Sequence, residues 1–265
     1  MPSPAEGAPL RITLLGGFRL AGADGSVRIP AGSERLLAYV ALRPGPVARS
    51  DVAENLWPGA SEARAHASLR SALTRLRGAG CCRALDTGPA EIALADGVAV
   101  DLHELRALAR GLLDTTEAVR GAVEGIGTGE IDGLSRDLLP GWCDEWALRE
   151  AEEWRQLRLH ALEALAGHFV GARRFGHAVS AAGAAVRAEP LRESAHAALI
   201  RAHLAEGNQS EALRAFRSYR TLLRSELGLN PTPVLLGLVA GLRPDASRVD
   251  GQSRGGHVTV TVRRP

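Results

Sequence analysis

The chain has 265 residues and a formal net charge of +2, with 45% hydrophobic and 23% charged residues. These values are typical of a packed globular protein and predict one large or two small domains. All 32 basic residues are arginine, which excludes mechanisms that need a lysine, such as a P-loop or a Schiff base. Aromatic residues make up only 4%, so we expect a core built mainly from Leu, Ala and Val in closely packed helices.

Membrane insertion and export are not expected. The longest uncharged run, residues 227–242, is interrupted by two prolines and is shorter than the ~20 apolar residues of a spanning helix. Residues 1–11 include Glu6 and no apolar segment, unlike a signal peptide. The cysteines have no metal-binding spacing and predict reduced thiols in the cytoplasm: Cys81, Cys82 and Cys143.

The first hundred residues predict strands, three helices and a hairpin. Residues 1–9 are rich in Pro, Ala and Gly and predict a flexible arm. A strand or hairpin around Gly16-Gly17 is expected over residues 10–20, and a short strand over residues 26–29. Serine residues are expected to cap the three helices that follow: Ser33, Ser50 and Ser61. A hairpin over residues 83–94 and a strand over residues 98–100 complete this unit, residues 10–100.

The third helix, residues 62–77, is amphipathic. Its apolar residues share one sector and are expected to pack on the first two helices: Ala65, Leu69, Ala72, Leu73 and Leu76. The opposite face has small residues at its centre and arginines at its margins. Small side chains let a helix enter the major groove, and long cations reach the phosphates on either side. A solvated surface helix is the alternative, but the preceding short helix and following hairpin favour a winged helix-turn-helix.

The candidate DNA-binding residues are exposed positions of this helix and the first residue of the hairpin: Arg64, His66, Ala67, Arg70, Ser71, Thr74, Arg75, Arg77 and Arg83. Because Arg70 lies beside the small residues of the centre, we expect it to contact a base edge, guanine O6 and N7. The marginal residues Arg64, Arg75 and Arg77 are expected to contact phosphates. The eight histidines form no metal-binding or catalytic motif, so we expect no metal, no cofactor and no enzymatic activity.

Residues 101–242 predict an all-α domain. A capping box is expected from Asp101 and Glu104, followed by helices over residues 102–113, 115–124 and 134–138 and a glycine loop over residues 125–129. A spacing of 34 residues, from position 158 to 192, then aligns two helix pairs and predicts a tetratricopeptide-like repeat. Matched small and aromatic residues support this register: Leu165 with Leu199, Ala178 with Ala212, Ala185 with Tyr219, and Phe169 and Phe216 in one unit each. A final helix is expected from residue 234, and residues 243–265 predict a disordered basic tail.

Several segments together resemble a known family. The segments SERLLAYVALRPG, RSDVAENLWPG and ARAHASLRSALTRLR resemble the DNA-binding domain of the Streptomyces antibiotic regulatory proteins, which have a winged helix. PLRESAH and ELGLNPTP resemble their bacterial transcriptional activation domain. The wing departs from the family pattern, which often has a glycine–aromatic pair and several basic residues. Here CRALDTGPAEIAL has Arg83 as its only cation, which weakens the expected minor-groove contact.

The resemblance implies a sequence-specific transcriptional activator of antibiotic biosynthesis genes. Its implied partners are double-stranded DNA with promoter direct repeats, RNA polymerase holoenzyme and a second copy bound cooperatively or as a homodimer. The implied location is the cytoplasm, at the nucleoid. The alternative is a tetratricopeptide adaptor whose winged helix binds protein rather than DNA. The arginine block at residues 63–84 favours DNA.

Overall fold

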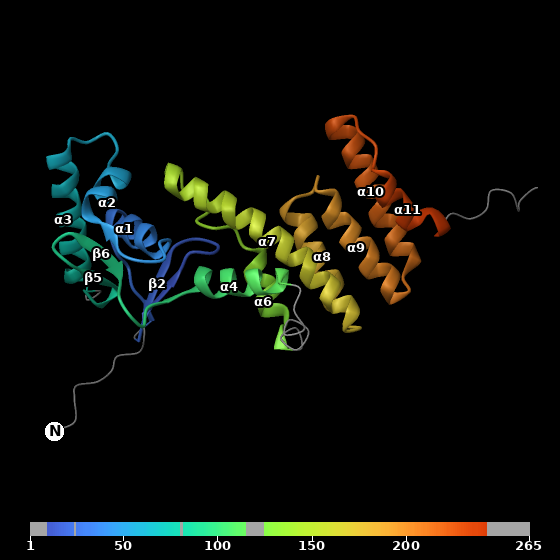
Figure 1. Ribbon diagram of the computed structural model, residues 1–265, viewed down its shortest axis with the longest axis horizontal. Helices are drawn as coiled ribbons and strands as arrows, with labels where there is room; N and C mark the ends of the chain where they lie inside the picture. The colour runs from blue at the N-terminus through green and yellow to red at the C-terminus, as the bar shows by residue number, and fades with distance from the viewer. Residues whose placement is uncertain (1–9, 24, 80–81, 115–124, 243–265) are drawn as a thin grey trace, which may run out of the picture.

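The structure, a computed structural model, describes residues 10–23, 25–79, 82–114 and 125–242. The N-terminal part is an α+β unit at one end of an elongated molecule, and the helices that follow extend away from it (Figure 1). Its strands are short: β1 (Arg11–Thr13), β2 (Arg19–Gly22), β3 (Gly25–Ser26), β4 (Val47–Ala48), β5 (Leu85–Thr87), β6 (Glu91–Leu94) and β7 (Ala99–Val100). Its helices are α1 (Ala31–Ala41), α2 (Arg49–Leu56), α3 (Glu62–Gly78) and the 3-10 turn η1 (Cys82–Ala84).

The strands form two sheets, with orders β3-β2-β1-β7 and β4-β6-β5. Both predicted hairpins are present: β1 pairs antiparallel with β2, and β5 with β6. The strand expected near residues 98–100 is β7, which pairs parallel with β1 and places Val100 opposite Ile12. Strand β4 was not predicted, because a strand of two residues is too short to show the alternation of apolar and polar residues that indicates a strand. It is defined only by its pairing with β6.

The serine caps are corrected by the structure. Helix α1 begins at Ala31, because Pro30 sets an extended N-cap, and the buried Ser33 hydroxyl donates to the Ala72 carbonyl on α3 at 3.1 Å. Helix α2 begins at Arg49, one residue before Ser50. Ser61 does precede α3, but its side chain forms no capping hydrogen bond.

The elements of the C-terminal part are all helices in its described residues, which also include short non-helical segments. Its elements are α4 (Asp101–Leu113), α6 (Thr128–Ser135), α7 (Glu145–Gly171), α8 (Phe175–Ala188), α9 (Glu193–Glu206), α10 (Gln209–Leu227), α11 (Pro233–Val239) and η2 (Ala240–Leu242). From α7 to α10 each helix packs against the next, and α11 lies against α9 and α10 (Figure 1). Left-handed Gly207 and Gly228, with φ of 87° and 68°, end α9 and α10.

The buried face of this stack includes most of the residues that the repeat alignment matched. Fully or nearly fully buried among them are Leu165, Phe169, Ala178, Ala185, Ala212, Phe216 and Tyr219, whereas Leu199 is only partly buried. Alanines at such positions let neighbouring helices approach closely. The 34-residue register itself stays a prediction, and so do the arm at residues 1–9, the helix at residues 115–124 and the basic tail, which lie outside the described residues.

The helix expected over residues 134–138 is wrong. Helix α6 spans Thr128–Ser135 and includes two residues of the predicted glycine loop. Its start is stabilised by the Glu130 carboxylate, which accepts a hydrogen bond from Gly127 N at 2.8 Å. After Ser135 the chain becomes extended, because Leu138 forms an antiparallel bridge with Leu15 of the N-terminal hairpin. A tertiary contact therefore decides where this helix ends.

The predicted capping box at the start of α4 is also wrong, since its two acidic residues reach the N-terminal hairpin instead. The buried Asp101 carboxylate accepts hydrogen bonds from Leu14 N at 2.9 Å and Leu15 N at 3.2 Å. Glu104 pairs with Arg11 at 2.8 Å. These bonds join the first helix of the C-terminal part to the strand β1 region.

Aromatic rings and one continuous core also connect the two parts. Trp146 packs edge-on against Tyr39 of α1 at 5.2 Å between ring centroids, and Trp142 lies 6.4 Å from Phe18 of the hairpin. Trp142 and Trp146 therefore lie at the contact between the two parts. Arg35 forms an ion pair with Asp144 across the same junction. A single cluster of buried residues runs from Ile12 to Ala202, so the two parts share one hydrophobic core.

Candidate nucleic-acid interface

Helix α3 buries the sector that its sequence predicts. Its buried residues are Ala65, Leu69, Ala72, Leu73 and Leu76, which pack toward α1 and α2. The predicted opposite face is exposed at Ala67, Arg70, Ser71 and Thr74. The helical phase assigned from the sequence is therefore confirmed. Figure 1 shows α3 at the outer end of the molecule, far from the stack of α8 to α11.

The three arginines Arg64, Arg70 and Arg75 are exposed, and none forms an ion pair with another described residue. The only carboxylate on α3 is Glu62, at its first turn, where it lies 4.0 Å from His66. The positive charge of the exposed face is thus not neutralised within the helix. An uncompensated row of guanidinium groups attracts a polyanion such as a nucleic acid backbone.

The remaining candidate side chains are partly engaged with the protein. Thr74 donates its hydroxyl hydrogen to the Arg70 carbonyl at 2.9 Å, so its side chain is turned along the helix. Arg77 donates to Thr87 of β5 at 3.3 Å, which ties the end of α3 to the hairpin. His66 is only half exposed. Arg83 is exposed but belongs to η1 rather than to the hairpin strand that the sequence predicted.

The β5–β6 hairpin has a cation that the sequence reasoning missed. Arg49, the first residue of α2, donates its guanidinium to the Gly88 carbonyl at the hairpin turn at 3.3 Å. Its backbone N–H donates to Ala90 O at 2.8 Å. The two residues are 39 positions apart, so only the pairing of β4 with β6 could reveal this proximity. The surface at the wing therefore has one more positive charge than the hairpin's own residues provide.

The described residues contain neither a cluster of metal-binding side chains nor a helix that is long and apolar enough to cross a bilayer. A two-sheet α+β unit with an exposed basic third helix, joined to a stack of helices, defines the class of winged-helix proteins with a helical C-terminal domain. Comparisons with known proteins agree with this class.

The family model of the bacterial transcriptional activator domain matches residues 100–243. Two curated relatives are regulatory proteins AfsR: that of Streptomyces griseus is 29% identical over 89% of this chain, and that of Streptomyces coelicolor A3(2) is 30% identical over 87%. This chain spans 24% of the length of each. The solved structure of Mycobacterium tuberculosis EmbR in complex with a low-affinity phosphopeptide has the same fold, with a TM-score of 0.66 at 24% identity. The match covers 90% of this chain and 66% of that one.

The chain therefore belongs to the bacterial transcriptional activator domain family.

Proposed function

We propose that this chain activates transcription by placing α3 in the major groove of promoter DNA. The observation that carries the proposal is the exposed face of α3, where small residues lie between arginines that have no carboxylate partner among the described residues. Arg70 lies beside the small residues and reads a base edge, guanine O6 and N7. Arg64 and Arg75 bind phosphates on either side.

The wing supports this docking through a second set of cations. Arg77 is bonded to the wing strand β5 and Arg49 to the wing turn, so both lie where the hairpin meets the helices. In this position they contact the backbone of the groove next to the one that α3 enters. Arg83, on η1, extends the same surface. Phosphate contacts from these residues fix the register of α3 without specifying sequence.

The helical domain provides the surface that contacts protein partners. We propose that two copies bind direct repeats cooperatively and that the surface of α7 to α11 engages RNA polymerase holoenzyme at promoters of secondary-metabolite genes. The match of residues 100–243 to the bacterial transcriptional activator domain family supports a role of this domain in activation. Linking two weak sites through a paired protein raises the apparent affinity without any new contact to DNA. A probe with two repeats should therefore bind more tightly than a probe with one, and only the pair should support activation in vitro.

The roles of the arginines are tested by a salt titration of the whole chain on a footprinted site and on scrambled DNA. Arg70→Ala should cost about 1–3 kcal/mol on the specific site and relax the base preference at one position. Arg64→Ala and Arg75→Ala should weaken binding to both DNAs and lower the salt slope by about one unit each. Arg217→Ala, which removes an exposed arginine of α10, is the matched control and should change neither.

Two outcomes contradict the proposal in different ways. If Arg70→Ala weakens both DNAs equally, Arg70 is a phosphate contact and the assigned groove orientation is wrong. If none of the three α3 variants changes binding, α3 does not enter the groove. The alternative function, a protein adaptor whose winged helix binds another protein, then replaces the proposal.

A further inference from the structure

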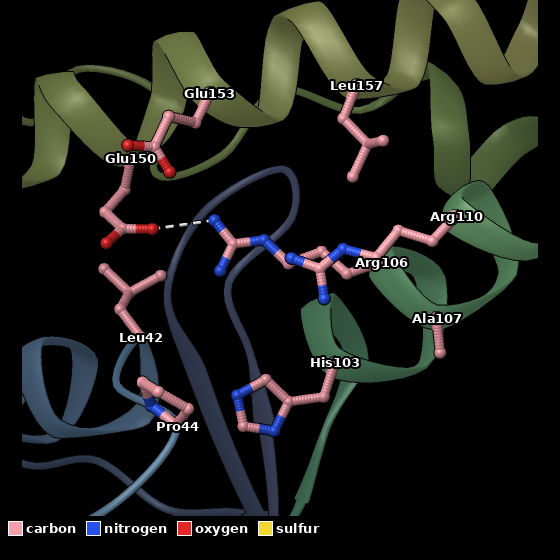
Figure 2. A pocket seen from close by; sticks show the side chains of 9 residues that line it. All are labelled: Leu42, Pro44, His103, Arg106, Ala107, Arg110, Glu150, Glu153 and Leu157. Carbon is pink, nitrogen blue, oxygen red and sulfur yellow. Dashed lines mark hydrogen bonds and ion pairs between the residues drawn. The ribbon is translucent and has the colours of Figure 1, made fainter. Parts of the chain in front are cut away.

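A pocket of about 620 Å³ lies where the winged-helix unit meets the helical domain (Figure 2). One wall is the end of α1 with the loop that follows it, and the others are α4 and α7. Small-molecule sites usually have volumes of ~300–1,000 Å³ and are frequent at domain interfaces. The pocket is separate from the exposed face of α3, so DNA contact does not account for it.

Some of the charged residues that line this pocket form ion pairs, and others do not. Glu150 accepts hydrogen bonds from two arginines, Arg106 at 2.7 Å and Arg43 at 3.2 Å. The Arg106 and Glu150 side chains are only 14% and 18% exposed, so this part of the pocket is built into the junction. Arg110 and Glu153 also line the pocket, and neither forms an ion pair with another described residue.

Figure 2 shows how the unpaired groups lie. Arg110 and Arg106 extend from α4 into the same part of the pocket, and Glu153 points into it from α7. The positive charge of Arg106 is already shared with Glu150, so an anion beside Arg110 finds a free guanidinium with a second cation behind it. A guanidinium of this kind binds carboxylates through two parallel hydrogen bonds. Glu153 is left to accept from a donor on the opposite side.

Apart from His103, whose Nε2 lies 2.7 Å from the Ala41 carbonyl oxygen, the rest of the lining is apolar. Leu42 and Pro44 come from the winged-helix side, while Ala107 and Leu157 come from α4 and α7. Leu42 is 3% exposed and forms a fixed apolar base at the end of α1. A ligand with only charged groups would leave this wall uncovered, whereas an apolar body would bury it. The ligand that fits is therefore amphipathic.

We propose that this pocket binds a small amphipathic molecule that carries both a carboxylate and an amine. The carboxylate is bound by Arg110, the ammonium group by Glu153, and the apolar body lies against Leu42, Pro44 and Leu157. Because the ligand touches residues of both domains, its binding should stabilise the junction between them. Its binding should therefore change the affinity of the chain for promoter DNA, a consequence that rests on the function proposed above.

The site is tested on the whole chain with three probes that share one phenyl group. These are L-phenylalanine, with both charged groups, phenylacetate, with the acid only, and 2-phenylethylamine, with the amine only. Ligand-observed NMR at millimolar concentration should rank L-phenylalanine first. Arg110→Ala should weaken L-phenylalanine and phenylacetate by about tenfold or more, the loss expected for one charge-assisted pair. Glu153→Gln should weaken L-phenylalanine but not phenylacetate.

Exposed Arg110 and Glu153 can be replaced without disturbing the core, and unchanged melting temperatures will verify this. The matched control is Arg201→Ala, an exposed arginine of α9, which should bind all three probes as the wild type does. The proposal is overturned if no probe binds the wild type. It is equally overturned if Arg110→Ala binds the two acids unchanged.

The consequence for DNA has a separate readout. Promoter affinity measured by fluorescence anisotropy should change when L-phenylalanine saturates the wild type and should stay constant for Arg110→Ala. Probe binding without any change in DNA affinity supports the site and overturns the coupling. Unchanged DNA binding in the α3 variants, together with normal probe binding, would contradict the proposed DNA contacts alone, so failures of the two proposals are distinguishable.

Discussion

The Asp101 carboxylate is the best place to test how the two domains are joined. It is 9% exposed and accepts three backbone hydrogen bonds, from Leu14, Leu15 and Leu102. Leu14 is fully buried, so its N–H has no access to water. Replacing Asp101 with alanine removes the acceptor for all three donors while the surrounding residues stay in place.

The expected cost follows from the number of donors left without a partner. A buried donor that loses its partner costs about 1–3 kcal/mol, and hydrogen bonds to a charged group are at the upper end. Asp101→Asn keeps one oxygen, which can serve Leu14 and Leu102, and places an amide N–H2 opposite Leu15 N. We expect about 1–3 kcal/mol for Asp101→Asn and roughly 3–5 kcal/mol for Asp101→Ala.

The assay is urea unfolding of the whole chain, followed by tryptophan fluorescence and by circular dichroism. The matched control is Glu104→Ala, which removes a carboxylate three residues away that pairs with Arg11 at the surface. That pair is about half exposed and should contribute no more than about 1 kcal/mol. Equal losses for Asp101→Ala and Glu104→Ala would refute the reasoning, because the buried donors would then have found other partners.

Two further predictions concern the helical stack. Ala178→Leu and Ala212→Leu should each lower the free energy of unfolding by ~1–3 kcal/mol, since both alanines are fully buried between helices. Thermal melts of these variants test this, with the exposed Ala205→Leu as the control. Unchanged melting midpoints in both variants would mean that the repeat register is accidental. Burial lowers the pKa of His196, although its contact with the Pro190 carbonyl opposes the shift. Because its folded pKa lies below the unfolded value of about 6.5, this histidine contributes stability above that pH that is lost as the pH falls. The free energy of unfolding should fall less between roughly pH 7.5 and 5.5 in His196→Gln than in the wild type or in the exposed control His160→Gln. If the fall in His196→Gln equals that of the wild type, His196 does not cause this pH dependence.

The sequence by itself determined most of the described helices, α6 excepted, and the exposed face of α3. Those features depend on local periodicity: five apolar residues fall in one sector of α3, and the same five are buried. The hairpins β1–β2 and β5–β6 followed from strand patterns separated by glycine turns. The resemblance to a regulator family followed from short motifs, and the family match over residues 100–243 agrees with it.

Only the tertiary structure decided the features that join distant residues. Helix α6 ends where Leu138 meets Leu15, Asp101 turns from its own helix to the hairpin, and Arg49 reaches a wing 39 residues away. The pocket at the junction likewise needs side chains from α4, from α7 and from the segment after α1, whose sequences give no sign of each other. Each of these depends on hydrogen bonds or ion pairs whose partners are set by how the helices and sheets pack, and no local pattern encodes that geometry.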